Sequence, residues 1–131
     1  MKKILTFLLL AIGLTTSVLA QEFTITDYRI SGVSNAEANE LQKEWLGGSI
    51  SLAFFDRTVK LENFHDSKGV EYTNMKFPIL NKIDNDTYSF IDKGSKTVLK
   101  LNKIAGYIRS ATVSKEDYEE KIKASIKLTR K

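Results

Sequence analysis

The sequence predicts a mostly β fold of the α+β class, an antiparallel meander flanked by an N-terminal helix and a C-terminal helix. Two observations predict it. Within residues 49–113, apolar residues alternate with polar ones in short runs, as in strands that bury one face. Turn-forming residues separate the runs about every ten positions, which is typical of a meander, a sandwich or a small barrel. An open sheet and a closed barrel both satisfy this pattern.

The start of the chain has the three parts of a secretory signal peptide. Two lysines follow Met1, residues 4–14 form an apolar run, and residues 18–20 form a cleavage sequence. The apolar run is short for a membrane span, although an uncleaved anchor is the alternative. We therefore expect a signal peptide at residues 1–20, one globular domain at residues 21–131, and a periplasmic or secreted protein.

The composition excludes several classes of function. The chain has 131 residues and no cysteine, so disulfides, thiolate chemistry and a lipid anchor on cysteine are ruled out. Its net charge is +4, of which +2 remains once Lys2 and Lys3 leave with the signal peptide. A charge this small does not favour a nucleic-acid partner.

A strand and a helix are expected before the meander. Residues 22–30 have strand-like composition, but the apolar parity changes at Asp27, which indicates a bulge or a break in an extra strand or a loose arm. Ser34 and Glu37 match a capping box, and the glycines at 47–48 can end the helix that follows over residues 36–46.

The meander itself begins with a hairpin. Residues 49–54 and 58–62 alternate around a polar turn, with Asp56 at its centre. Pro78 lacks a backbone donor, so the strand around it is an edge, bulged or broken. The remaining strands are expected at residues 87–91, 97–101 and 107–113.

Residues 114–131 have the pattern of a second helix. Ser114 and the acids that follow resemble a helix start, and the basic residues near the end suit the helix dipole. Tyr118, Ile122 and Ile126 repeat every four residues and form an apolar stripe. We expect this helix to pack on the sheet or on a partner.

No catalytic or metal-binding pattern is found. His65 is the only histidine, and without cysteine the usual zinc ligand sets are out of reach. A hydrolase using His65 is the weakest hypothesis, because the Gly-x-Ser-x-Gly sequence is missing. The run at 84–86 starts like a calcium loop, but Tyr88 and the lack of the required glycine break the pattern. We expect no enzyme activity, catalytic residue, cofactor or metal.

The order of elements resembles the lipocalin-like (calycin) plan. In that plan a short helix with a nearby tryptophan precedes an antiparallel barrel, and a helix follows it. Here Trp45, the only tryptophan, precedes the first meander strand, and residues 114–131 follow the last. The Gly-x-Trp motif is absent, because Gly47 and Gly48 come after the tryptophan. The resemblance implies a small β-barrel.

We therefore expect non-catalytic binding of a small apolar ligand inside the sheet or barrel. Aromatic side chains would line the site, although aromatics more often form core, and Trp45 could equally plug one end of the sheet. The candidate ligand-binding residues are Trp45, Phe54, Tyr72, Tyr88 and Tyr107. The alternative is a protein–protein interaction module of the cell envelope, with the strand edge at Pro78 and the basic C-terminal segment as its surface.

Overall fold

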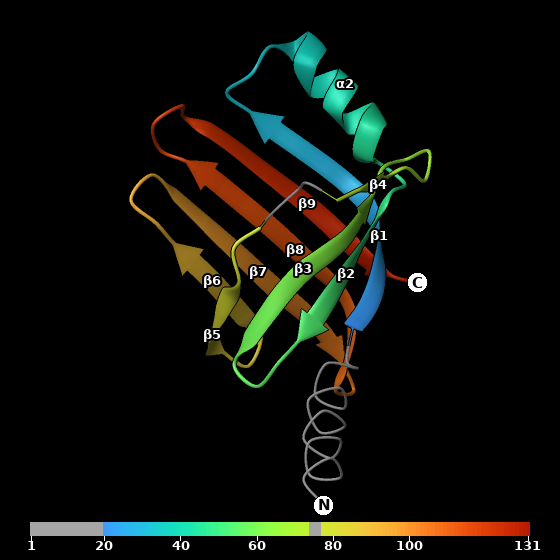
Figure 1. Ribbon diagram of the computed structural model, residues 1–131, viewed down its shortest axis with the longest axis vertical. Helices are drawn as coiled ribbons and strands as arrows, with labels where there is room; N and C mark the ends of the chain where they lie inside the picture. The colour runs from blue at the N-terminus through green and yellow to red at the C-terminus, as the bar shows by residue number, and fades with distance from the viewer. Residues whose placement is uncertain (1–19, 74–76) are drawn as a thin grey trace, which may run out of the picture.

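The chain forms a closed antiparallel barrel of eight strands with one helix among the described residues, as the computed structural model of residues 20–73 and 77–131 shows (Figure 1). The elements are β1 Ala20–Ser31, α2 Asn35–Trp45, β2 Ser49–Phe54, β3 Thr58–His65, β4 Glu71–Tyr72, β5 Leu80–Asp84, β6 Thr87–Ile91, β7 Ser95–Ile104, β8 Tyr107–Asp117 and β9 Ile122–Arg130. The signal peptide predicted for residues 1–20 lies, apart from Ala20, outside the described residues and stays a prediction.

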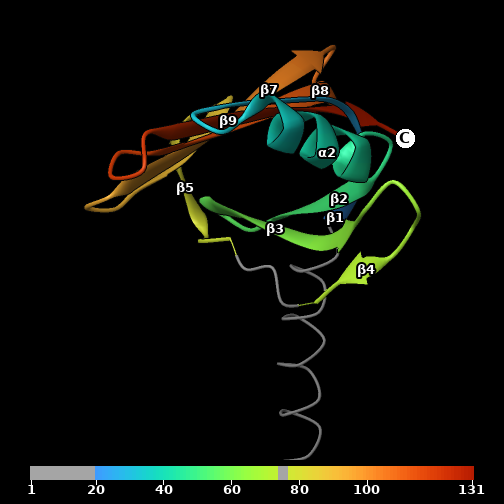
Figure 2. The same ribbon diagram turned by 90° about the horizontal axis from the view of Figure 1, so that it is seen from above.

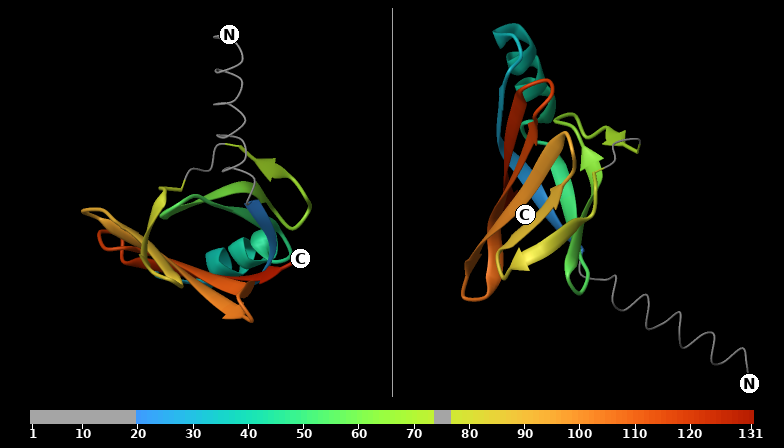
Figure 3. Two further views of the ribbon diagram at one scale, coloured as in Figure 1. Left: turned by 90° about the horizontal axis from the view of Figure 1, so that it is seen from below. Right: turned by 90° about the vertical axis from the view of Figure 1, so that its left-hand side faces the viewer.

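The strands close into a ring in the order β2, β1, β9, β8, β7, β6, β5, β3, and β3 returns to β2. Every pairing in the ring is antiparallel, and all except the β1–β9 pair join barrel strands that follow one another along the chain. Views along the barrel show the ring, with α2 across one end (Figures 2 and 3). Of the two forms that the sequence left open, the closed barrel is therefore the one adopted, which agrees with the lipocalin-like outline. Closure pairs strand edges that would otherwise invite aggregation.

One seam of the ring, the pairing of β3 with β5, is short. β5 pairs with β3 only through Thr58↔Asn81 and Val59↔Leu80. The two-residue strand β4 pairs with the other end of β3, at Phe64. Among the described residues, the edge of β3 over residues 60–63 therefore has no strand partner on this side.

The middle of the barrel is filled by apolar side chains. Alternate residues of each strand point inward, and the fully buried ones include Leu52, Val59, Leu80, Leu99 and Leu128. In β1 the parity change at Asp27 is absorbed by a bulge, because the register with β9 shifts between Ile25 and Asp27. Tyr28 consequently returns to the inner face, opposite Ile126.

The helix forms where the capping box predicts it. The Glu37 backbone N–H donates to Ser34 Oγ at 3.2 Å. After the helix, the Gly47 N–H donates to the Ile25 carbonyl at 2.9 Å and the Ile25 N–H donates to the Gly48 carbonyl at 2.8 Å. These bonds fix the helix exit against β1. They place the end of α2 over the barrel opening.

The predicted C-terminal helix is wrong, because residues 114–131 form the end of β8, a turn and β9. A four-residue repeat is also two strand periods, so the spacing of Ile122 and Ile126 fits both structures. The acids that resembled a helix start form the turn instead: Asp117 Oδ1 accepts from the backbone N–H groups of Glu119 and Glu120 at 3.0 and 3.1 Å. Lys121 has a φ of 57° in this turn.

The strand expected around Pro78 is also changed. Residues 77–79 form no strand, and β5 begins at Leu80. The missing backbone donor of Pro78 accounts for the break that the sequence suggested. Residues 105–106 form a tight turn between β7 and β8, in which Ala105 and Gly106 both have positive φ, of 53° and 83°.

Candidate functional site

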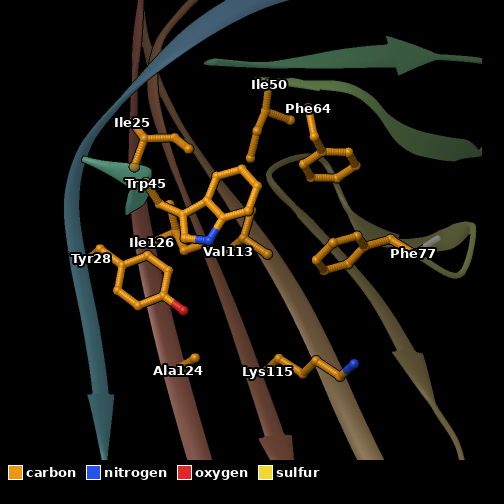
Figure 4. A pocket seen from close by; sticks show the side chains of 10 residues that line it. All are labelled: Ile25, Tyr28, Trp45, Ile50, Phe64, Phe77, Val113, Lys115, Ala124 and Ile126. Carbon is orange, nitrogen blue, oxygen red and sulfur yellow. The ribbon is translucent and has the colours of Figure 1, made fainter. Parts of the chain in front are cut away.

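The candidate site is an apolar cavity of about 170 Å³ at the α2 end of the barrel. Figure 4 shows the side chains around it. They come from six different elements and the segment before β5, and most are apolar: Ile25, Tyr28, Trp45, Ile50, Phe64, Phe77, Val113, Lys115, Ala124 and Ile126. Apolar cavities of about 150 Å³ in other proteins stay dry and accept benzene. The space therefore suits one ring or a chain of about six carbon atoms.

The cavity exists because the inward-facing residues of β8 and β9 are no longer large and apolar near the turn that joins the two strands. Ala111 and Leu128 are paired and buried in the filled part of the barrel. Two layers farther along, the inward pair is Lys115 and Ala124. A methyl group and a flexible charged chain cannot fill the space that two large apolar side chains would occupy. The core consequently thins beneath α2.

Trp45 covers this space from the helix side. It is the only residue of α2 that is buried, although Leu41 is half-buried. Its ring packs against Tyr72 of β4, with the centroids 4.9 Å apart and the planes tilted by 51°. The single proton of the Tyr72 hydroxyl is shared between two acceptors, Glu44 Oε1 and Asp66 Oδ2, each at 3.3 Å. The Tyr72 ring that packs against Trp45 is therefore fixed in place by a network of polar groups.

Asp66 is the centre of that network. Its Oδ1 accepts from the backbone N–H groups of Lys68 and Val70, each at 2.9 Å. The Val70 hydrogen bond contributes most to lowering the pKa of Asp66 below its ordinary value. The adjacent Ser67 ties the loop to α2, because its N–H donates to the Glu44 carbonyl at 2.7 Å. Burial, followed by the negative charge of Glu44, raises the pKa of Tyr72.

Two aromatic rings form the wall on the side of the short seam. Phe64 and Phe77 stack with their centroids 5.1 Å apart and their planes at 18°. The same two rings line an open groove outside the barrel, along the edge of β3 over residues 60–63. They therefore stand between the cavity and the outer surface.

The five predicted ligand-binding residues fall into three places. Trp45 lines the cavity, and Tyr72 contacts its ring from outside. Phe54 and Tyr88 meet edge to face at 5.8 Å elsewhere in the barrel. Tyr107 is 69% exposed beside the β7–β8 turn. Only Trp45 belongs to the cavity lining, and ligand binding by the set stays a prediction.

Lys115 and Tyr28 were missed by sequence reasoning. The signal for Lys115 was present, because it continues the inward positions of Ala111 and Val113 by the two-residue period. Treating residues 114–131 as a helix concealed it. The inward position of Tyr28 could be predicted only by locating the bulge in β1.

The polar groups singled out in the sequence have local partners. His65 Nδ1 lies 3.0 Å from the carbonyl oxygen of Asn63. Asp84 Oδ1 accepts from the Asp86 N–H at 2.9 Å in the β5–β6 turn, and this bond contributes most to lowering the pKa of Asp84. In the part of the chain that the structure describes, no three histidine or acidic residues are grouped to hold a metal ion.

Within residues 20–73 and 77–131, no helix has both the length and the apolar character to cross a membrane.

Comparison with protein-family models, with curated proteins and with solved structures finds no match. The functional argument therefore depends on the geometry of the cavity.

Proposed function

We propose that this protein is a non-catalytic, exported binding protein that holds a small apolar ligand in the cavity beneath α2. The observation that supports it is the contrast within one barrel: the middle is filled, whereas the α2 end keeps about 170 Å³ among apolar side chains. Membership of the lipocalin-like proteins is part of this proposal, and it draws on the closed barrel and the tryptophan at its end.

The size of the space limits the ligand. Pockets for drug-sized molecules usually measure about 300–1,000 Å³. The present cavity is smaller, so the buried group is a single ring or a short chain. A larger ligand would have to extend past the cavity opening or displace the ring of Phe77.

The test is a titration of the full chain with hexan-1-ol, followed by Trp45 fluorescence and by NMR. Trp45 is the only tryptophan and lines the cavity, so its emission reports on occupancy. Ala124→Phe should fill the space and abolish the response. Ala36→Phe, at an exposed position of α2, makes the same substitution away from the cavity and should leave the response unchanged. Equal responses of the wild type and Ala124→Phe would refute the proposal.

An interaction module is the second candidate, on the evidence of the opposite end of the barrel. Ile104 and Tyr107 are cross-strand neighbours there and are 57% and 69% exposed. Phe55, in the β2–β3 turn at the same end (Figure 1), is also exposed. Exposed apolar groups of this kind favour a protein contact. Capture of an envelope protein that is lost in Ile104→Ser/Tyr107→Ser, but kept in Ala124→Phe, would support it; capture unaffected by the double substitution would exclude this surface.

A further inference from the structure

Lys115 is the only charged residue among the described side chains that line the cavity. Strand alternation places it on the inner face of β8, in the row of Ala111 and Val113. Its register partners are Thr97 on β7 and Ala124 on β9, neither of which carries a charge. An ammonium group is thus placed at the opening of an otherwise apolar space.

Within the described residues, no ion pair neutralises the charge of Lys115. Among residues 20–73 and 77–131, no carboxylate lies within 4.0 Å of its Nζ, since the four ion pairs found there involve other residues. Its Nζ lies over the face of the Phe77 ring, 5.7 Å from the centroid. The Lys115 side chain therefore lines the cavity with no ion pair among the described residues, and its ammonium group can donate to a ligand.

Tyr28 supplies a second polar group at the same place. Figure 4 shows its hydroxyl on the side of the cavity where Ala124 and Lys115 lie. No hydrogen bond of this hydroxyl is found within the described part of the chain. A tyrosine hydroxyl is protonated at neutral pH and can donate; burial, followed by the charge of Glu44, raises the pKa of Tyr28 further above its ordinary value.

We infer that the ligand is a small amphiphilic carboxylate, whose apolar part enters the cavity beside Trp45 and whose carboxylate binds Lys115 at the opening. The Tyr28 hydroxyl donates a second hydrogen bond to the carboxylate. One cation and one neutral donor match a single-charged head group, and charge-assisted hydrogen bonds are the stronger kind. This inference rests on the proposed function, which supplies the apolar part of the site.

The experiment compares three ligands with the same six-carbon chain: hexanoate, hexan-1-ol and hexylamine. Each is titrated into the full chain at neutral pH and low salt, followed by Trp45 fluorescence and NMR shifts. Hexanoate should bind about fivefold more tightly than hexan-1-ol, as expected for one partly exposed ion pair with an added hydrogen bond. The advantage should shrink as salt is raised. Hexylamine should bind most weakly, because its charge repels Lys115.

Two matched substitutions identify the group responsible. Lys115→Gln should remove the preference for hexanoate and leave hexan-1-ol binding unchanged. Lys127→Gln makes the same change of charge on the exposed outer face of β9 and should keep the preference. Tyr28→Phe should reduce it in part. Thermal unfolding confirms that each variant is folded.

The outcomes separate the two claims. Binding of hexan-1-ol equal to that of hexanoate, or a preference for hexanoate that survives Lys115→Gln, would overturn the carboxylate inference and leave the apolar site standing. Absence of binding by all three ligands would overturn both. Equal losses in Lys115→Gln and Lys127→Gln would show that the preference reflects overall charge, which also rejects the inference.

Discussion

Truncation of Leu128 to alanine tests the barrel at β9, the strand that the sequence pattern predicts as a helix. Leu128 lies on β9, paired with Ile25 and Ala111, and its side chain is 0% exposed. The change removes three buried carbon groups, which at about 0.8 kcal/mol each amounts to about 2.4 kcal/mol of transfer free energy. The cavity left behind adds to this, so we expect a loss of about 3 kcal/mol in the free energy of unfolding.

In the alternative helix, Leu128 would lie about 200° around the axis from Ile126, on the face away from the apolar stripe. The same truncation would then cost little. Urea unfolding monitored by Trp45 fluorescence and circular dichroism measures the difference, and the melting temperature should fall by on the order of 10 °C. Lys127→Ala, one residue away on the outer face, should change stability by less than about 0.5 kcal/mol. A loss below about 1 kcal/mol for Leu128→Ala would refute the β9 assignment.

Two further predictions concern the support behind Trp45. Because the folded-state pKa of Asp66 is lowered, its carboxylate contributes stability that is present above the unfolded-state pKa and lost as pH falls through the folded-state value. The stability difference between the wild type and Asp66→Asn, measured by urea unfolding, should therefore be present at neutral pH and close in acid; a gap independent of pH would contradict this. At Gly48 an added Cβ would lie 2.2 Å from the His65 carbonyl oxygen, so Gly48→Ala should destabilise the protein by about 3 kcal/mol in chemical unfolding. Gly47 has a φ of 93° but no atom near its Cβ position, so Gly47→Ala should cost only about 1 kcal/mol, and a larger loss there than at Gly48 would count against the packing argument.

Local signals in this chain predicted local structure well. The N-cap at Ser34, the bulge near Asp27 and the polar turns between strands were confirmed, because each depends on a few neighbouring residues. Closure of the ring depends on pairing β1 with β9, about a hundred residues apart in the chain. No local pattern reports such a contact, so the open and closed forms were indistinguishable.

In the candidate site, too, local sequence patterns identified some residues, whereas others depended on the three-dimensional arrangement. Trp45 was found because it is unique and lies in the last turn of a capped helix. Lys115 depends on knowing that β8 continues to Asp117, and the even spacing of the apolar residues after it left the period ambiguous. Phe54, Tyr88 and Tyr107 were selected by residue type alone, which says nothing about the end of the barrel at which a side chain lies.

The pairing of the first described strand with the last has a consequence for synthesis and folding. Phe23 is opposite Arg130, so the ring cannot be completed until the final strand is available. Contacts this distant in the chain make folding slow. A chain that stops before Ile122 would expose the unpaired edges of β1 and β8 together, and such nascent or truncated molecules should self-associate unless a chaperone holds them.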